Sequence, residues 1–287
     1  MTHKIALLAK TNSIVGEGPL WNHLEKKLYF VDIRGKCFWR MDWNDQTLQR
    51  VDLPQQLGCL AFAENGDLLL AMEDGVYRRN EAGELRLAHA PAKIKGRRFN
   101  DGKVGPDGRF YLGTTDDAGQ GAFYCLHDGQ LVELFGGAYC ANGLDWTADA
   151  GTMYYVDSPV RAIEMFDFCP GAPQPLTNRR RCWDAKHLGP QNVQPDGMCI
   201  DAEGMLWTAF WGGWMALRIN PKTGEVLDKL ELPVERVSSC AFAGENMDQL
   251  IVSTAAYQAD MHEQPLAGCI FRVQVDVPGV LPNRYKG

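Results

Sequence analysis

A short apolar strand, a turn and a second apolar strand recur six times along this chain of 287 residues. In every repeat the first strand ends in an apolar anchor residue. The anchors are Trp21, Phe62, Val104, Trp146, Ile200 and Phe242. They are 41, 42, 42, 54 and 42 residues apart, close to the span of one four-stranded propeller blade. The repeat predicts an all-β fold, a six-bladed β-propeller with four-stranded blades, as a single domain over residues 1–287.

The second strands and their turns agree with this fold. The second strands are expected at 28–32, 68–72, 110–114, 153–157, 206–210 and 250–254. Most of them follow turns rich in Asn, Asp and Gly, which tight hairpins require. Third and fourth strands follow several repeats, as at 75–79 and 84–87. The longest interval contains about 12 extra residues, and we expect part of them in a surface excursion at 169–175.

A propeller has to close its ring, and two segments outside the six repeats can do so. An apolar segment at 4–9 precedes the first repeat, and another strand-like segment lies at 268–275. We expect the N-terminal strand to complete the last blade as its outer strand.

Charge and composition exclude several classes of partner. The net charge of −7 argues against a nucleic-acid partner, and we expect the one basic cluster, residues 179–181, in a solvated loop. No apolar run approaches the roughly 20 residues that span a bilayer, and residues 1–13 lack a secretory signal pattern. Nine cysteines without a Cys-x-x-Cys spacing indicate neither a disulfide framework nor a zinc ribbon. We expect a cytoplasmic protein with no membrane partner; the sequence does not indicate its oligomeric state.

One position in each repeat is expected to face the propeller axis. The residues four positions before the anchors are Glu17, Gly58, Asn100, Asn142, Asp196 and Ser238. Equivalent positions of successive blades meet at one height of the central channel, so two carboxylates and two carboxamides would form an oxygen-rich ring. Such a ring suits one divalent cation, calcium, magnesium or manganese, while zinc and iron(II) stay open. The six histidines fall outside this register, which disfavours a histidine-dominated zinc site.

Turn chemistry is the alternative explanation for some of these residues. Asn142 and Asp196 each precede a glycine, and Asn-Gly and Asp-Gly pairs are turn signals in their own right. Glu17 is a poor turn former, however, and turn chemistry does not explain a register shared by four oxygen donors. The set therefore favours a metal site.

Four segments resemble the signatures of a known family. Residues 16–21, 98–104, 142–146 and 195–198 are similar, in order and spacing, to those of the regucalcin family, also called the senescence marker protein and gluconolactonase-like family. The resemblance implies a six-bladed propeller that holds one divalent cation and hydrolyses sugar lactones. It implies Glu17, Asn142 and Asp196 as metal ligands. It also implies that Arg98 and Asn100 contact the substrate and the metal's water.

The chain departs from the animal regucalcin pattern at one substrate contact. Those proteins place a glutamate that touches the sugar where this chain has Ala118, preceded by Thr115, Asp116 and Asp117. This form resembles the bacterial sugar-lactonase branch of the family. We expect Asp116 or Asp117 to take over the contact with the sugar.

These residues together predict a hydrolase that opens an aldono-1,4- or 1,5-lactone to the aldonic acid. Asp196 is the candidate general base as well as a ligand. Arg98 is a candidate for stabilising the oxyanion or holding sugar hydroxyls, with a surface salt bridge as the alternative. Gly-x-Ser-x-Gly, Walker A and Gly-x-Gly-x-x-Gly motifs are absent. Two other functions stay open, a phosphotriesterase-like hydrolase and a non-catalytic calcium-binding or protein-interaction propeller.

Overall fold

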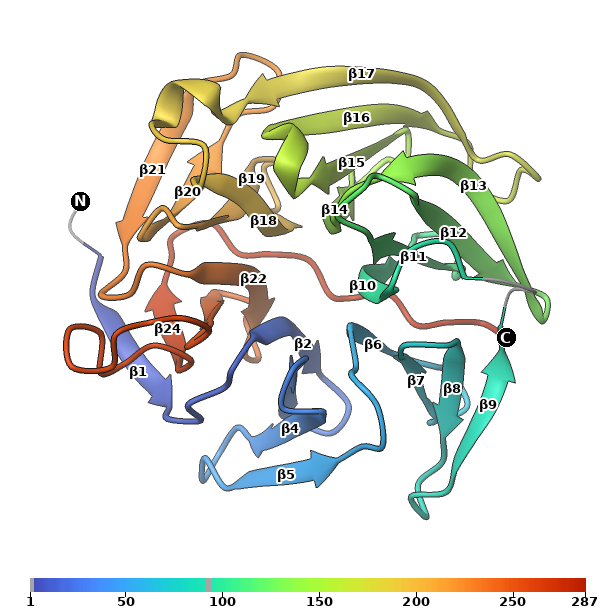
Figure 1. Ribbon diagram of the computed structural model, residues 1–287, viewed down its shortest axis with the longest axis horizontal. Coiled ribbons are helices and arrows are strands. Elements are labelled where there is room, and N and C mark those ends of the chain that lie inside the picture. The colour runs from blue at the N-terminus through green and yellow to red at the C-terminus, as the bar shows by residue number, and fades with distance from the viewer. Residues whose placement is uncertain (1–2, 91–93) are drawn as a thin grey trace.

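Six four-stranded antiparallel sheets stand in a ring around a central channel (Figure 1). The computed structural model describes residues 3–90 and 94–287. Blade 1 comprises β2 (Gly16–Asn22), β3 (Lys27–Asp32), β4 (Cys37–Asp42) and β5 (Leu48–Asp52). Blade 2 comprises β6 (Cys59–Phe62), β7 (Leu68–Ala71), β8 (Val76–Arg79) and β9 (Leu85–His89). Blade 3 comprises β10 (Arg98–Val104), β11 (Phe110–Thr115), β12 (Gly121–His127) and β13 (Gln130–Ala138).

The other three blades follow the same plan. Blade 4 comprises β14 (Ala141–Trp146), β15 (Thr152–Asp157), β16 (Ala162–Phe168) and β17 (Leu176–Asp184). Blade 5 comprises β18 (Gln194–Ile200), β19 (Leu206–Trp211), β20 (Met215–Ile219) and β21 (Val226–Glu231). Blade 6 comprises β22 (Val237–Ala243), β23 (Gln249–Thr254), β24 (Ile270–Gln274) and β1 (Ile5–Ala9). The six-bladed propeller predicted from the repeat is therefore confirmed.

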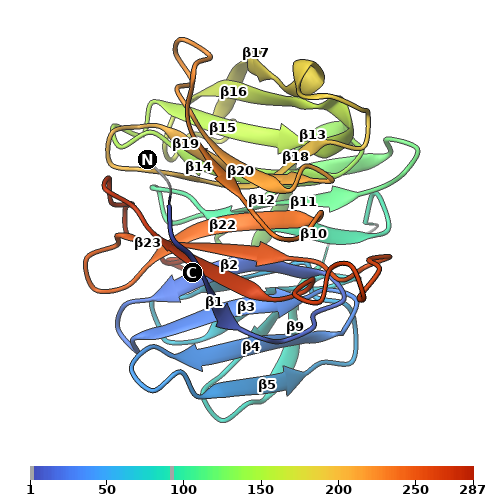
Figure 2. The same cartoon turned by 90° about the vertical axis from the view of Figure 1, so that its left-hand side faces the viewer.

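The N-terminal strand closes the ring as predicted. β1 pairs antiparallel with β24, with Ile5 opposite Val273 and Leu7 opposite Phe271. Figure 2 shows this dark blue strand beside the last blade. Leu8 is buried in the core of the last blade, whereas Leu7 is 46% exposed.

Alternating apolar side chains explain why the blades pack against one another. The second strands are buried along almost their whole length because each lies between two neighbouring blades. The anchors of the first strands are all buried as well. Five apolar clusters fill the ring, and the largest joins blades 1, 5 and 6.

Blade 4 contains the extra residues of the long interval. Part of them form the turn 169–175, where the Cys169 amide bonds to the Pro175 carbonyl at 2.9 Å. Others form two short 3-10 helices, η1 (Ser158–Val160) and η2 (Ala185–Leu188). Neither has the length or the apolar character needed to cross a membrane, and the described residues form no longer helix.

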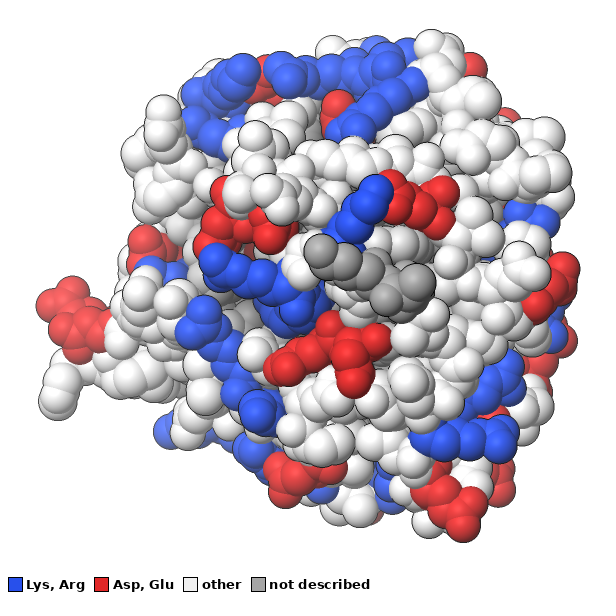
Figure 3. Space-filling view, turned by 45° about the vertical axis from the view of Figure 1, so that its right-hand side comes forward, with Lys and Arg blue, Asp and Glu red and all other residues white. Residues whose placement is uncertain are grey.

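The basic cluster lies in a strand, so the predicted solvated loop is wrong. Arg179, Arg180 and Arg181 belong to β17, the outer strand of blade 4. Their guanidinium groups form ion pairs with Glu164, Asp167 and Asp184, respectively. Figure 3 shows Lys and Arg side chains along the upper edge of the molecule, where β17 lies. Three consecutive arginines occupy both faces of this strand, so the sequence shows no alternation of apolar and polar residues there.

The first strands give the channel two distinct ends. Because Glu17 lies opposite Val31, the turn 33–36 that follows β3 lies at the same end of the channel as Glu17. We call this end, with the corresponding turns of the other blades, the upper rim. The turns that join first and second strands, such as 64–67 and 201–204, form the lower rim.

The C-terminal segment 275–286 crosses the channel at the lower rim, and we call it the strap (Figure 1). Its backbone bonds join Ala202 N to Pro278 O, Gly279 N to Met247 O, Tyr285 N to Phe62 O and Lys286 N to Gly108 O. These partners lie in, or directly before, the turns between first and second strands of blades 5, 6, 2 and 3. The strap thus ties opposite sides of the ring together and covers the lower end of the channel.

Candidate active site

A β-bulge lies at the axial register of five blades. The pairing of first and second strands shifts between Glu17 and Leu20, Phe99 and Gly102, Asn142 and Leu144, Pro195 and Met198, and Val237 and Ser239. A bulge breaks the alternation of a strand and turns a side chain in a new direction. Blade 2 has no such shift, and Gly58 occupies its register. The bulges therefore explain how polar residues of strands that are otherwise core-facing reach the channel.

Two glycines let the first strands approach closely enough for the polar side chains to meet. A Cβ atom on Gly143 would lie 2.5 Å from the carbonyl oxygen of Asp196, and one on Gly197 would lie 2.0 Å from Ser239 Oγ. Neither position tolerates a side chain without movement of the neighbouring blade. Each glycine directly follows a predicted ligand, Asn142 or Asp196, so the Asn-Gly and Asp-Gly pairs serve packing between blades.

The predicted ligands Glu17, Asn142 and Asp196 are all buried, as is Asn100, with exposed fractions between 4% and 7%. Glu17 Oε2 accepts a hydrogen bond of 2.9 Å from the Gly18 amide. Asp196 Oδ1 is buried and has no hydrogen-bond partner. A buried carboxylate oxygen without a partner is costly unless a cation compensates it.

Burial and nearby carboxylates raise the pKa of Glu17 and of Asp196. Burial, together with the charge of Asp101, raises the pKa of Glu17 to about 8. Burial and the charges of Glu17 and Asp101 raise the pKa of Asp196 well above its ordinary value. Two carboxylates of different blades, Glu17 and Asp101, thus act on the buried Asp196. A hard divalent cation fits this donor set, since it would neutralise two carboxylates and take oxygen ligands.

The cation would also require the amide oxygen of Asn142. Within residues 3–90 and 94–287, no three His, Cys, Asp or Glu side chains converge closely enough to hold a metal by themselves. Glu17 and Asp196 are two such groups, and Asn142, at the same register of blade 4, would supply a third oxygen from its carboxamide. The predicted donor set is therefore a mixed one, with two carboxylates and one carboxamide.

Arg98 and Asn100 lie together, next to Asn142. Arg98 Nη1 donates to Asn100 Oδ1 at 2.6 Å and to the Phe99 carbonyl at 2.8 Å. Asn100 Nδ2 donates to Asn142 Oδ1 at 2.9 Å and to the Ala141 carbonyl at 2.8 Å. Burial lowers the pKa of Arg98. Arg98 has no ion pair among the described residues, so the surface salt bridge considered from the sequence is not what the structure contains.

Asp116 and Asp117 lie on the upper rim but outside the buried cluster. They follow Thr115, which pairs with Arg98. Asp116 Oδ1 accepts hydrogen bonds from two amides of its own loop, those of Ala118 at 2.9 Å and Gln120 at 3.2 Å. Asp117 is exposed and forms an ion pair of 2.5 Å with Arg97. Their contact with a sugar stays a prediction.

Sequence reasoning missed three residues at the site. Asp101 follows Asn100 within the bulge, and burial raises its pKa to about 6. Cys140 Sγ accepts long hydrogen bonds from the side-chain Nδ2 atoms of Asn100 and Asn142, both at 3.6 Å. Ser158 Oγ accepts from Asn142 Nδ2 at 2.8 Å. None of the three lies in the register that repeats between blades. Asp101 alone could have been found from the sequence, because it directly follows Asn100 in an Asn-Asp-Gly stretch.

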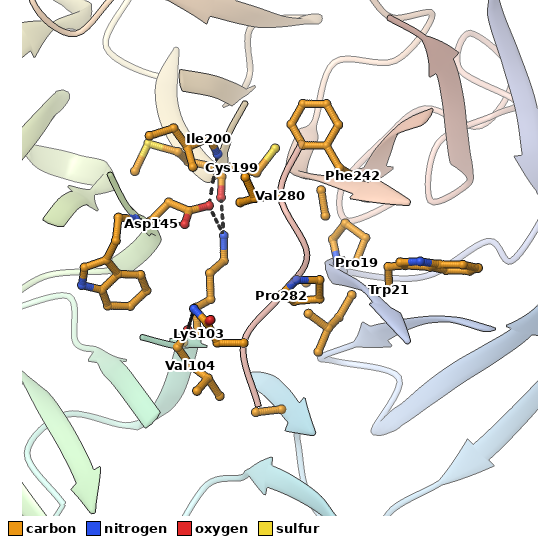
Figure 4. Close-up of a pocket in the computed structure, with 18 of the residues that line it drawn as sticks. Pro19, Trp21, Lys103, Val104, Asp145, Cys199, Ile200, Phe242, Val280 and Pro282 are labelled. Carbon is orange, nitrogen blue, oxygen red and sulfur yellow. Dashed lines mark hydrogen bonds and ion pairs between the residues drawn. The ribbon is translucent and has the colours of Figure 1, made fainter. Parts of the chain in front are cut away.

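A cavity of about 300 Å³ lies in the channel beside the strap (Figure 4), and Glu17, Asn100, Asn142 and Asp196 are not among the residues that line it. Gly18 and Asp101 line its upper end, while Val280 and Pro282 of the strap line its lower end. In its wall Lys103 Nζ bonds to Asp145 Oδ2 at 2.8 Å and to the Met198 carbonyl at 3.1 Å. Lys103 is thus paired with Asp145, and its charge also opposes the rise that burial causes in the pKa of Asp101.

A six-bladed propeller with buried oxygen donors at the axis of its channel defines the structural class of this protein. The chain belongs to the SMP-30/gluconolactonase/LRE-like family, whose model matches residues 15–256. It is 34% identical to human regucalcin, with 99% of each chain covered.

Solved structures share the whole fold. A luciferin-regenerating enzyme is 28% identical, with a TM-score of 0.90 over 99% of this chain and 100% of the other. A calcium-binding regucalcin of Agrobacterium tumefaciens is 24% identical, with a TM-score of 0.93 over 100% of this chain and 99% of the other. The family predicted from the four sequence segments is confirmed.

Proposed function

We propose that this protein hydrolyses a sugar lactone, an aldono-1,4- or 1,5-lactone, to the aldonic acid with the help of one divalent cation. The observation that carries the proposal is the unpartnered, buried Asp196 Oδ1 at the channel axis, beside Glu17 and Asn142. Membership of a family that includes gluconolactonases supports the choice of reaction. We further propose that the activity belongs to the cytoplasm and involves no nucleic-acid or membrane partner.

Glu17, Asn142 and Asp196 would hold the cation. When bound, such a cation polarises an ester carbonyl and acidifies water. Calcium, magnesium and manganese suit the oxygen donors best, and a calcium-binding relative with the same fold supports the first of these.

Asp196 is proposed as the general base. One oxygen of its carboxylate can bind the cation while the other accepts the proton of the attacking water, and no described residue bonds to Oδ1. Water oxygen adds to the lactone carbonyl carbon, and the bond from that carbon to the ring oxygen then breaks. The proton taken by Asp196 goes to the ring oxygen, which leaves as a hydroxyl group. The product is the open-chain acid, and the reaction consumes only the lactone and one water.

Arg98 and the upper rim are proposed to hold the substrate. Arg98 Nη1 is bonded to Asn100 and the backbone, and its remaining N–H groups can bind sugar hydroxyls or the developing oxyanion. Asn100 keeps Arg98 in place and lies beside Asn142. Asp116 and Asp117, on the same rim, are proposed to accept hydrogen bonds from sugar hydroxyls.

A panel of pentono- and hexonolactones, assayed before and after chelation and after return of Ca²⁺, Mg²⁺ or Mn²⁺, tests the proposal. We expect hydrolysis of at least one lactone, loss of activity with chelator and recovery with metal. Phosphotriesters in the same assay test the other hydrolase function. Tight cation binding without turnover of either substrate class would instead support a non-catalytic calcium-binding propeller.

A further inference from the structure

We infer that Ser158 is a positioning residue that fixes the orientation of the Asn142 carboxamide and so aims Asn142 Oδ1 at the cation. The inference rests on the proposed cation site. It concerns a residue that has no expected contact with either cation or substrate, and it follows from the direction of the hydrogen bonds around one hydroxyl group.

The backbone around Ser158 is fixed from three sides. The Ser158 amide donates to the Cys140 carbonyl at 3.1 Å, and the Ser158 carbonyl accepts from the Arg161 amide at 3.0 Å. The preceding carboxylate, Asp157, accepts from the amides of Tyr139 and Cys140 at 3.0 and 2.8 Å. Ser158 itself begins the 3-10 helix η1, and Pro159 follows it. The Ser158 side chain is therefore held, 5% exposed, beside the first strand of blade 4.

The Ser158 hydroxyl has only one way to satisfy its two neighbours. Ser158 Oγ lies 2.7 Å from the Pro195 carbonyl oxygen and 2.8 Å from Asn142 Nδ2. A carbonyl oxygen can only accept, so the single hydroxyl proton points to Pro195. The hydroxyl can then offer only a lone pair to Asn142. Asn142 must turn its NH₂ group to Ser158, and its oxygen faces the opposite way.

The same direction continues through the next blade. Asn100 donates one N–H to the Ala141 carbonyl, which again can only accept, and the other to Asn142 Oδ1. Asn100 Oδ1 then accepts from Arg98 Nη1. In this chain of hydrogen bonds each residue donates to the next, from Arg98 at one end to the Pro195 carbonyl at the other. The orientation of each carboxamide therefore depends on both Arg98 and the Ser158–Pro195 pair. Ser158 forms the end that lies beside Asp196.

Ser238 provides a matched comparison in blade 6. Its hydroxyl donates to the Gly16 carbonyl at 2.5 Å, directly before Glu17, as Ser158 donates directly before Asp196. Ser238 is as buried as Ser158. It contacts Ser253 Oγ and no carboxamide ligand. Ser238→Ala therefore removes a buried hydroxyl group next to the proposed ligand Glu17, but it removes no hydrogen bond of a ligand side chain.

Calorimetric titration of metal-free protein with Ca²⁺ and Mn²⁺ tests the inference on the parent, Ser158→Ala, Ser158→Thr and Ser238→Ala. We expect Ser158→Ala to weaken cation binding about 10- to 100-fold, as loss of a group that orients a ligand does. Ser158→Thr retains the hydroxyl and should bind within about threefold of the parent, like Ser238→Ala. In the Asn142→Ala background, Ser158→Ala should have almost no further effect, because the carboxamide it orients is gone.

Parental affinity in Ser158→Ala, or an equal loss in Ser238→Ala, overturns the inference. If Ser158→Ala does not fold, Ser158→Cys replaces it, since a thiol keeps the size and is a weak acceptor; parental affinity there also overturns the inference. A parent that binds no cation, or an Asn142→Ala variant that binds as the parent does, overturns the proposed site as well. Loss of binding in Asn142→Ala with none in Ser158→Ala overturns the role of Ser158 alone.

Discussion

The Nδ2 atom of Asn100 donates a hydrogen bond of 2.9 Å to Oδ1 of Asn142 and joins the first strands of two neighbouring blades. Oδ1 of Asn142 is also the oxygen expected to face the cation. A carbonyl oxygen has two lone pairs, so it can keep the bond from Asn100 while it binds a cation. The substrate-contacting pair Arg98 and Asn100 is thereby linked to the cation site through one oxygen atom.

Removal of a ligand should weaken cation binding and spare the fold. Glu17→Gln and Asn142→Ala are each expected to reduce affinity at least tenfold, because the site depends on only three ligand side chains from the protein. Calorimetry with Ca²⁺ and Mn²⁺ measures the change. Glu81→Gln, a change of an exposed carboxylate, is the control and should leave binding unaltered. Parental affinity in both ligand variants would place the site elsewhere.

The metal-free protein should lose stability as the pH rises. The pKa of Glu17 is about 8 in the folded protein against an ordinary value of 4.5, so between these values the folded state binds more protons than the unfolded state. Stability then decreases with rising pH across this window. We expect the Tm of chelated protein to fall by several degrees between pH 5 and pH 8.

Two comparisons isolate this effect. Saturating Ca²⁺ should remove most of the fall, because the cation binds the carboxylates in their charged form. Glu17→Gln should make the metal-free dependence shallower. A chelated parent whose Tm is constant or rises from pH 5 to pH 8 contradicts the account.

Much of this architecture could be predicted from the sequence because it repeats. The 42-residue period shows where each blade begins, and the position four residues before each anchor leads to Glu17, Asn142 and Asp196. Contacts that do not repeat could not be found in this way. Ser158 contacts Asn142 of its own blade and Pro195 of the neighbouring blade, and no spacing along the chain encodes that meeting.

Two other differences have similar physical causes. Asp101 points to the axis because a bulge interrupts the alternation of β10, and bulges leave little signal in a single sequence. The strap has no strand period because its backbone bonds go to turns of four blades rather than to one neighbouring strand.

The strap should contribute stability through Tyr285. Its side chain is 1% exposed, and its backbone bonds to Phe62 and Glu64. Tyr285→Ala is expected to cost about 3–5 kcal/mol, as loss of a buried aromatic ring does. Tyr285→Phe keeps the ring and both backbone bonds and should cost far less. Denaturant unfolding of the two variants measures the difference, and equal stabilities would show that the strap is not packed as described.

Ring closure by β1 should depend on its buried side. Leu8→Ala is expected to destabilise the protein by about 2 kcal/mol or more, whereas Leu7→Ala, on the exposed side, should be nearly neutral. A chain that starts at Val15 exposes the edge of β24 and should aggregate. Thermal melting and light scattering check both. A truncated chain as stable and as soluble as the parent would contradict closure by this strand.

The most direct test of the central claim is the turnover of Asp196→Asn at saturating metal with the preferred lactone. The substitution keeps the size of the side chain and one oxygen ligand but removes the proton acceptor. We expect cation binding to persist and turnover to fall about a hundredfold to ten-thousandfold, the range for loss of a general base. Near-parental turnover of the metal-saturated variant would contradict the account and would assign the base to another group.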